Sequence, residues 1–239
     1  MELKQMDHRT RGIINSFIER SRGALAGNLK SIVLYGSFSR GEYSKRHSDL
    51  NILLVLDKVD LPALAGISRI KRVYKFRNIA ALALSRSYLE NSTDTFPIEF
   101  SDMRESYVIL WGEDYIKGLK IDLKNLRHQC EWELKTKIIQ MQQLYVNSAG
   151  STAALRGFLI RGLPSFMVVF KNILRLKGKF ETNPEKILEM LAGEFSLNKD
   201  VPDKLWRSRG LGCKIADVQE TFGAFLEELR KLSDSLDRL

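Results

Sequence analysis

The sequence has few cysteines and no long apolar run. Its only cysteines are Cys130 and Cys213, both among apolar residues with helical spacing. Their separation fits no zinc motif, so we expect reduced thiols and no disulfide. No stretch approaches the roughly 18 apolar residues of a membrane span, and the charged residues 1 to 9 lack the apolar segment of a signal peptide. These absences predict a cytoplasmic protein that contacts no membrane.

Acidic residues are also in deficit. The 239 residues include 38 Lys and Arg against 29 Asp and Glu, a net charge of +9. This excess favours polyanionic partners without singling out nucleic acid. Hydrophobic residues make up 44% of the chain, which is enough for a full core, and the length lies between one and two ordinary domains.

A short apolar run ends at a Gly-Ser pair. Residues 31 to 35 predict a buried strand, and Gly36-Ser37 follows where we expect a turn that opens into a helix. A glycine lets backbone N–H groups approach a polyphosphate, the Ser37 hydroxyl adds a donor, and a helix N-terminus attracts negative charge. The pattern indicates a phosphate-binding turn.

A second apolar strand begins with two side chains that carry oxygen. Asp49 and Asn51 are two residues apart, so in a strand they lie on one face and could meet one Mg²⁺. Each feature alone is common in ordinary turns and strand caps. Their order within one block favours a nucleotide site.

This block resembles the signature of the nucleotidyltransferase superfamily, which includes DNA polymerase β, the minimal nucleotidyltransferases and kanamycin nucleotidyltransferase. The signature is Gly-Ser, an Arg-Gly pair, Asp-x-Asp on the next strand, and a third carboxylate on a later strand. The resemblance covers about residues 28 to 112. It implies an α+β domain with a mixed sheet and flanking helices. The residues that match are Gly36-Ser37, Arg40-Gly41 and Ser48-Asp49, whereas Asn51 replaces the second aspartate.

The resemblance also implies an activity: transfer of a nucleoside monophosphate, AMP in our interpretation, from a Mg²⁺-bound triphosphate to a hydroxyl, with release of pyrophosphate. Gly36 and Ser37 would hold the phosphates and Arg40 would neutralise their charge. Asp49 and Asn51 would ligate metal. The acceptor is open: a small molecule, a protein side chain and an RNA end are all compatible.

The third carboxylate is expected on a strand after residue 80. Residues 79 to 84 predict one apolar strand, and residues 96 to 103 predict another, in which Glu99 stands between apolar neighbours. Glu99 is therefore the candidate for a metal ligand or catalytic base. Asp102 is the alternative, although it lies at odd spacing from Glu99 and near the end of the expected strand, where a cap of the next helix is the simpler role.

Asn51 leaves two outcomes open. An amide oxygen can ligate Mg²⁺ but carries no charge to balance a triphosphate. The chain is then either a slower enzyme that uses Asp49 and Glu99, or a non-catalytic nucleotide-binding or antitoxin-like module that binds a partner.

Five cations lie between Arg69 and Arg77 among apolar and aromatic residues. Such a segment could bind nucleic-acid phosphates. We favour the simpler interpretation, an exposed edge strand or a solvated helix face.

Helical periodicity dominates the rest of the chain. Residues 7 to about 27 predict a helix that covers the sheet. Apolar stripes predict four further helices, at about 119–147, 155–173, 182–191 and 215–236, with a kink or break at Pro164 and a capping box from Thr182. Four helices with short joins suggest an antiparallel bundle, which could also form a homodimer contact. We therefore expect a nucleotidyltransferase domain at 1–115 and an all-α bundle domain at 116–239.

Overall fold

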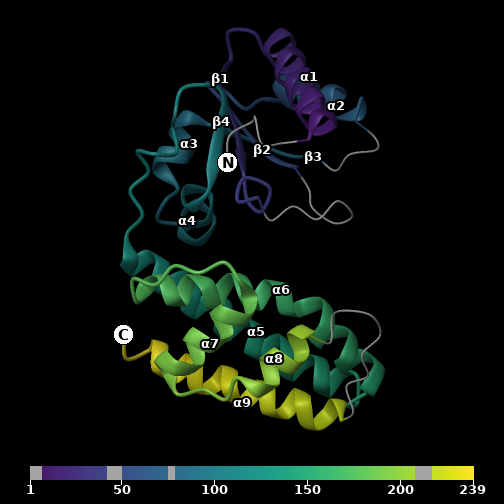
Figure 1. The fold of residues 1–239 in the computed structure, drawn as a ribbon, viewed down its shortest axis with the longest axis vertical. Coiled ribbons are helices and arrows are strands. Elements are labelled where there is room, and N and C mark those ends of the chain that lie inside the picture. Colours follow the sequence, from purple (N-terminus) through teal and green to yellow (C-terminus); the bar gives the residue numbers. More distant parts are fainter. Residues whose placement is uncertain (1–6, 42–49, 75–78, 208–216) are drawn as a thin grey trace. The chain divides into compact units, whose positions relative to one another are not determined.

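The computed structural model describes residues 7–41, 50–74, 79–207 and 217–239 (Figure 1). The chain forms two compact units, Met1–Asp122 and Leu123–Leu239. The sequence analysis placed the boundary near residue 115.

The first unit is built on a sheet with the strand order β3-β2-β1-β4. Its strands are β1 (Leu29–Tyr35), β2 (Leu50–Leu56), β3 (Ile79–Ser85) and β4 (Tyr107–Gly112). β1 runs antiparallel to β2 and β4, whereas β2 and β3 are parallel. The mixed sheet and the strands predicted at 31–35 and 79–84 are confirmed. The sequence analysis missed β4, an apolar run that it took as the end of the region.

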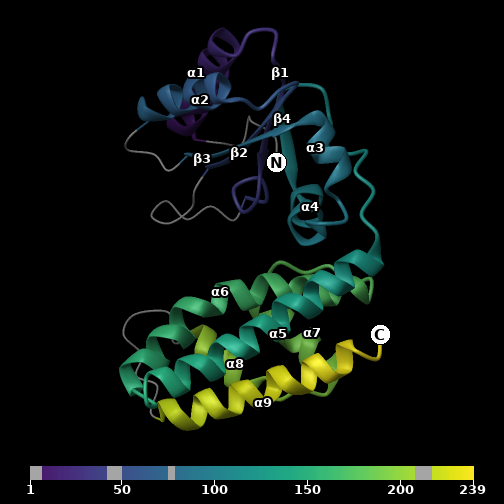
Figure 2. The same cartoon turned by 180° about the vertical axis from the view of Figure 1, so that it is seen from behind.

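Two helices cover one face of this sheet. They are α1 (His8–Ala24), which Asp7 caps at its N-terminus, and α2 (Leu61–Arg72), which Asp60 caps. They lie side by side (Figures 1 and 2). Ile14 and Phe17 of α1 and Ile67 of α2 pack on Ile52 and Leu54 of the central strand β2. Because side chains alternate along a strand, the other residues of β2 point to the opposite face. The helix predicted at residues 7 to 27 is confirmed.

The opposite face is covered by α3 (Arg86–Asn91), α4 (Pro97–Glu105) and the segment 113–121. Phe100, Met103 and Ile116 pack there against Val33 and Leu53. The strand predicted at residues 96 to 103 is wrong. Pro97 occupies the first turn of a helix, where its fixed φ is favourable, and residues three apart, Phe100 and Met103, reach the sheet together.

The second unit is helical, as predicted. Its helices are α5 (Leu123–Asn147), α6 (Thr152–Leu176), α7 (Pro184–Phe195), α8 (Asp200–Arg207) and α9 (Val218–Leu236). The core joins α5, α6 and α9, with the rings of Phe166 and Phe225 5.1 Å apart. The short helix α8 was not predicted, and Asn183 rather than Thr182 caps α7.

Helix α6 departs from two expectations. It continues through Pro164 from Thr152 to Leu176, so the proline does not break it. By length and composition it is also long and apolar enough to cross a membrane, the one such helix among the described residues, so the expectation that no segment approaches a span is wrong for α6. Core helices pass the same test, and eleven α6 residues are buried.

Candidate functional site

The end of β1 forms a tight turn at Gly36. Its φ is +83°, in the left-handed region that glycine adopts without strain. The Gly36 carbonyl accepts a hydrogen bond from the backbone N–H of Ser39 at 3.1 Å, and the Phe38 carbonyl accepts one from Gly41 at 3.2 Å. Residues 37 to 41 are turns, so the helix expected after Ser37 is wrong as far as residue 41.

Gly36 and Asn51 lie in contact. Asn51 is paired with Tyr35 in the β1–β2 register, and its side chain lies over the Gly36 Cα. A Cβ at position 36 would lie 2.8 Å from Asn51 Nδ2, closer than such atoms approach. The structure thus brings together two residues that the sequence analysis selected, and a side chain at position 36 would adopt an unfavourable φ and force the Asn51 amide to shift.

Ser39 anchors the turn, which the sequence analysis did not foresee. Its hydroxyl is buried and lies 2.7 Å from the Gly36 carbonyl oxygen, 2.7 Å from the Ser106 carbonyl oxygen and 2.9 Å from Ser106 Oγ. Phe38, 2% exposed, packs into the core on the α1–α2 side. The turn is therefore fixed both to the start of β4 and to the core. The only signal in the sequence was a second serine two residues after Ser37.

Ser37 and Arg40 stand on this turn, and both are half-buried. Both belong to the turn of residues 37 to 41 that follows Gly36. Their roles as phosphate donor and counter-charge stay predictions.

A row of paired residues crosses the sheet at the end of β1, next to Gly36. Register joins Ala80 of β3 to Asn51, Asn51 to Tyr35, and Tyr35 to Tyr107 of β4. Paired positions on neighbouring strands share a face, so one amide and two phenols stand in this row. The sequence analysis missed both tyrosines, although Tyr35 directly precedes Gly36.

Both tyrosines stay protonated at neutral pH. Burial raises the pKa of Tyr35 above its usual value of 10.0. Burial and a 2.9 Å hydrogen bond that the phenol donates to Asp114 raise the pKa of Tyr107 to about 12. The free phenol of a protonated tyrosine is a hydrogen-bond donor, not a base. Tyr35 can therefore donate to a phosphate or a sugar oxygen at this edge.

The predicted carboxylates are distributed differently from the expectation. Glu99 lies on α4 and not on a strand, and its side chain is exposed while Ile98 and Phe100 are buried. Asp102, the alternative, lies on the same helix. Glu99 has an apolar neighbour on each side, and this pattern of three residues is expected both in a strand and at the edge of the buried face of a helix. Its role as ligand or base stays a prediction.

Asp49 lies outside the described residues, directly before Leu50 of β2. The four described strands contain no Asp or Glu, and Ala80 stands where β3 meets Asn51. No group of His, Cys, Asp and Glu suited to a metal ion occurs within the described ranges. Of the three metal ligands that the sequence predicted, the described strands contain only Asn51, whose amide oxygen can ligate Mg²⁺ but carries no charge. The described residues thus show the turn at Gly36 and the amide of Asn51 beside it, and the metal-binding roles of Asp49, Asn51 and Glu99 stay predictions.

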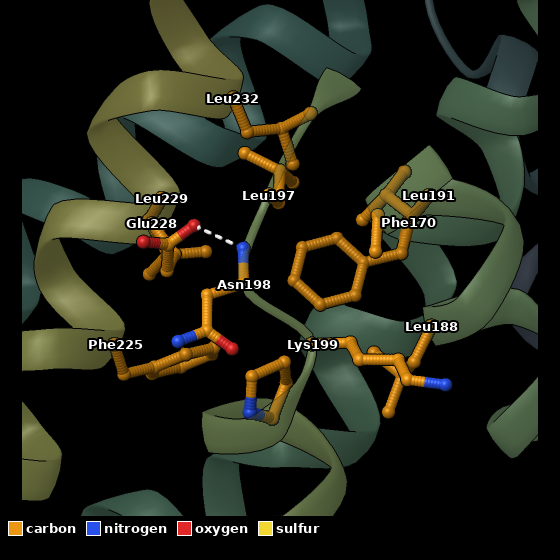
Figure 3. Close-up of a pocket in the computed structure, with 12 residues that line it drawn as sticks. Phe170, Leu188, Leu191, Leu197, Asn198, Lys199, Phe225, Glu228, Leu229 and Leu232 are labelled. Carbon is orange, nitrogen blue, oxygen red and sulfur yellow. Dashed lines mark hydrogen bonds between the residues drawn. The ribbon is translucent and has the colours of Figure 1, made fainter. Parts of the chain in front are cut away.

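Two other hollows lie elsewhere in the described structure. One, among α6, α7, α8 and α9, is lined by apolar side chains such as Phe170, Leu188 and Leu232, and the carboxylate of Glu228 accepts a 2.8 Å hydrogen bond from the backbone N–H of Asn198 there (Figure 3). Its volume of about 20 Å³ holds little more than one water molecule. The other is an open, polar hollow of about 430 Å³ beside α3 and the segment after β4. There Arg86 pairs with Glu90, and Tyr115 donates to Glu113. Neither hollow contains Gly36 or Asn51.

Comparisons with known proteins identify the fold. No family model matches the sequence, and no curated protein matches it. Among solved structures, the chain is similar to spectinomycin adenyltransferase AAD(9) from Enterococcus faecialis, crystallised with ATP and spectinomycin. The TM-score is 0.55 at 15% identity, covering 92% of this chain and 98% of that chain. The chain therefore has the fold of a nucleotidyltransferase with a helical C-terminal region, as predicted from Gly36-Ser37 and its surroundings.

Proposed function

We propose that the chain transfers a nucleoside monophosphate, AMP, from a nucleoside triphosphate to a hydroxyl group of a small molecule. The observation that carries the proposal is the contact between Gly36 and Asn51 at the end of β1, within a nucleotidyltransferase fold. The strand end, the left-handed glycine and the paired amide support the proposal because they bring together two motif positions that are 15 residues apart in the chain. The similar structure was crystallised with ATP and a small molecule, which favours this acceptor class and this nucleotide.

The proposed roles follow from the geometry. Backbone N–H groups of the turn and the Ser37 hydroxyl bind the phosphates, and Arg40 balances their charge. Tyr35 donates a hydrogen bond from the same edge. In the reaction, the acceptor oxygen bonds to the α-phosphorus, the bond to the bridging oxygen breaks, and pyrophosphate leaves. Glu99 is proposed to accept the proton that leaves the acceptor hydroxyl, and Asp49 and Asn51 would hold Mg²⁺, whose charge would stabilise the phosphates. Within this proposal the protein acts in the cytoplasm.

A second candidate is a module that binds a nucleotide or a partner without transferring anything. The observation that favours it is the missing acid: the described strands supply an amide at Asn51 and an alanine at Ala80, and no carboxylate. Two-metal phosphoryl transfer depends on carboxylate charge to hold its ions. The turn could bind phosphate even where transfer has been lost.

The deciding experiment has two readouts. Purified protein is first titrated with ATP, GTP, CTP and UTP in the presence of Mg²⁺ by calorimetry. A panel of polyhydroxylated small molecules is then tested as acceptors, and pyrophosphate release is followed for each. ATP labelled at the α-phosphate measures transfer of the label to each acceptor directly. Asp49→Asn is the matched control because it keeps size and removes one charge.

Transfer of label in the native protein but not in Asp49→Asn would support the enzyme. Saturable binding without pyrophosphate release for every acceptor would support the binding module. The absence of triphosphate binding would contradict both the enzyme and a nucleotide-binding module.

A further inference from the structure

The outward line of helix α5 is apolar. Trp132, Ile139 and Val146 are 60%, 52% and 74% exposed. They stand seven residues apart, which is close to two helical turns, so they form one stripe along the helix. The buried side of α5 is a different set that packs within the bundle: Leu126, Cys130, Leu134, Ile138 and Met141.

Such a stripe is not needed for the fold of the second unit. A helix on a protein surface usually places polar and charged residues on the line that points to solvent. In α5 that line carries a tryptophan and two β-branched residues. Exposed aromatic and aliphatic residues that form a continuous stripe are typical of a protein interface, and the charges beside Trp132 are paired with one another within the helix.

The charges of α5 are confined to one half of the helix. All of them fall between Lys124 and Lys137, and the sequence from Ile138 to Leu155 contains no charged residue. Glu131 and Lys135 form an ion pair at 2.7 Å, and Glu133 and Lys137 form one at 3.1 Å, so these acids already have partners within the helix. The stripe therefore begins in a charged half and continues into an uncharged half.

We propose that α5 pairs with α5 of a second copy of this chain, antiparallel, about a two-fold axis at Ile139. Ile139 then faces Ile139 of the second copy, and Trp132 faces Val146 of the second copy. A two-fold interface uses the same surface on both subunits, so each contact occurs twice. The contact from Trp132 to Val146 extends over about 21 Å of helix.

The charge distribution selects both the occupant and the direction. About an axis at Ile139, Lys135 faces Gln143 and Glu131 faces Asn147, so the charged half of each helix meets the uncharged half of the other. A parallel pair would set Lys135 against Lys135. Two copies of a chain with a net charge of +9 repel each other, and an antiparallel contact along α5 brings no like charges together. A partner of opposite charge would instead be recognised by unpaired cations, which this stripe lacks.

Sedimentation equilibrium tests whether the pair forms. Between about 1 µM and about 100 µM, the native chain is expected to shift from 27.4 kDa towards twice that mass. Ile139→Glu places two carboxylates at the axis and is expected to weaken the dimer about 100-fold or more. Gln140→Glu is the matched control, since it adds the same charge to an exposed position about 100° around the helix.

A mass of one chain at every concentration would overturn the proposal. So would a dimer that Ile139→Glu leaves intact, or one that both variants disrupt equally. Circular dichroism of each variant checks that the helices remain, and exposure at position 139 makes this outcome expected.

Cross-linking tests the direction. Single cysteines are introduced in a Cys213→Ser background, with Cys130 retained because it is buried, and treated with a bis-maleimide shorter than about 10 Å, the diameter of a helix. Ile139→Cys is expected to cross-link to itself. Val146→Cys is expected not to cross-link to itself, because its two copies lie about 21 Å apart along an antiparallel pair. When the two proteins are mixed, Val146→Cys is expected to cross-link with Trp132→Cys. Self-linking of Val146→Cys without mixed linking would establish a parallel pair and overturn the proposal.

Discussion

At the scale of single residues, Gly36 couples backbone conformation to the placement of Asn51. A side chain at position 36 meets two separate penalties. The left-handed φ costs a non-glycine residue about 1–2 kcal/mol, and the new Cβ collides with the Asn51 amide. The unfavourable φ lowers the free energy of unfolding, and the collision displaces the Asn51 side chain from its place beside the turn.

Gly36→Ala is therefore expected to abolish triphosphate binding while the protein stays folded. The matched control is Gly27→Ala, because Gly27 has a similar φ of +77° but a Cβ there meets nothing within 4 Å. Both variants should lose about 1–2 kcal/mol of unfolding free energy in urea, and calorimetry should show lost binding for Gly36→Ala alone. Unchanged affinity in a folded Gly36→Ala protein would remove the phosphate role from this turn.

Asn51 allows a test in which function is gained. Asn51→Asp adds a negative charge on the face that Asp49 is predicted to share, two residues or about 6.6 Å along the strand. We expect tighter Mg²⁺-dependent triphosphate binding and, with an acceptor present, faster transfer. Asp49→Asn should do the opposite. If Asn51→Asp leaves metal affinity unchanged or lower in titrations with Mg²⁺, residue 51 does not face a metal.

Tyr107 makes stability depend on alkaline pH. Its pKa is raised from 10.0 to about 12 in the folded protein, so the folded state holds the proton more tightly than the unfolded state. The resulting stabilisation is complete below pH 10 and is lost as the pH rises from 10 to 12. Tyr107→Phe is expected to flatten the decline of unfolding free energy in this window. Identical urea midpoints across the window in both proteins would contradict the coupling.

At the scale of elements, the last turn of α2 carries the cations that the sequence singled out. Arg69, Lys71 and Arg72 are exposed at the C-terminus of that helix, where positive charge is favourable. The described part of the segment is thus a solvated helix face, one of the two simpler interpretations, whereas residues 75 to 78 lie outside the described ranges.

We therefore expect weak, unsaturable binding of RNA near physiological salt, measured by fluorescence anisotropy with a labelled single strand. Replacing Arg69, Lys71 and Arg72 together by alanine should change it little. Arg9→Ala on α1 serves as a control for the loss of any exposed cation. A tight, saturable complex that the triple replacement weakens would instead indicate an RNA acceptor.

At the scale of the whole molecule, each unit contains its own core. The sheet packs between α1 and α2 on one face and α3, α4 and the segment 113–121 on the other, and the second unit buries residues of α5 to α9 against one another. A unit with a separate core can fold alone. We expect a polypeptide of residues 123–239 to show helical circular dichroism and one cooperative thermal transition. A fragment without a transition would mean that it needs the first unit to fold.

The sequence by itself determined the local features. Strand β1, the Gly-Ser turn at its end, the apolar start of β2 and the helical second half all follow from short-range patterns of apolar spacing and turn residues, which act within a few positions of the chain. The motif around Gly36 was sufficient to predict the fold that the structural comparison confirms.

Tertiary structure decided what depends on partners far along the chain. Residues 96 to 103 alternate like a strand, yet they form a helix because Pro97 begins one and the sheet face accepts Phe100 and Met103 from it. Ser39 became an anchor only through Ser106, 67 residues away. The row from Ala80 to Tyr107 exists only in the sheet register. Hydrogen-bond register and packing against a shared face are properties of the folded chain, so no local pattern could supply them.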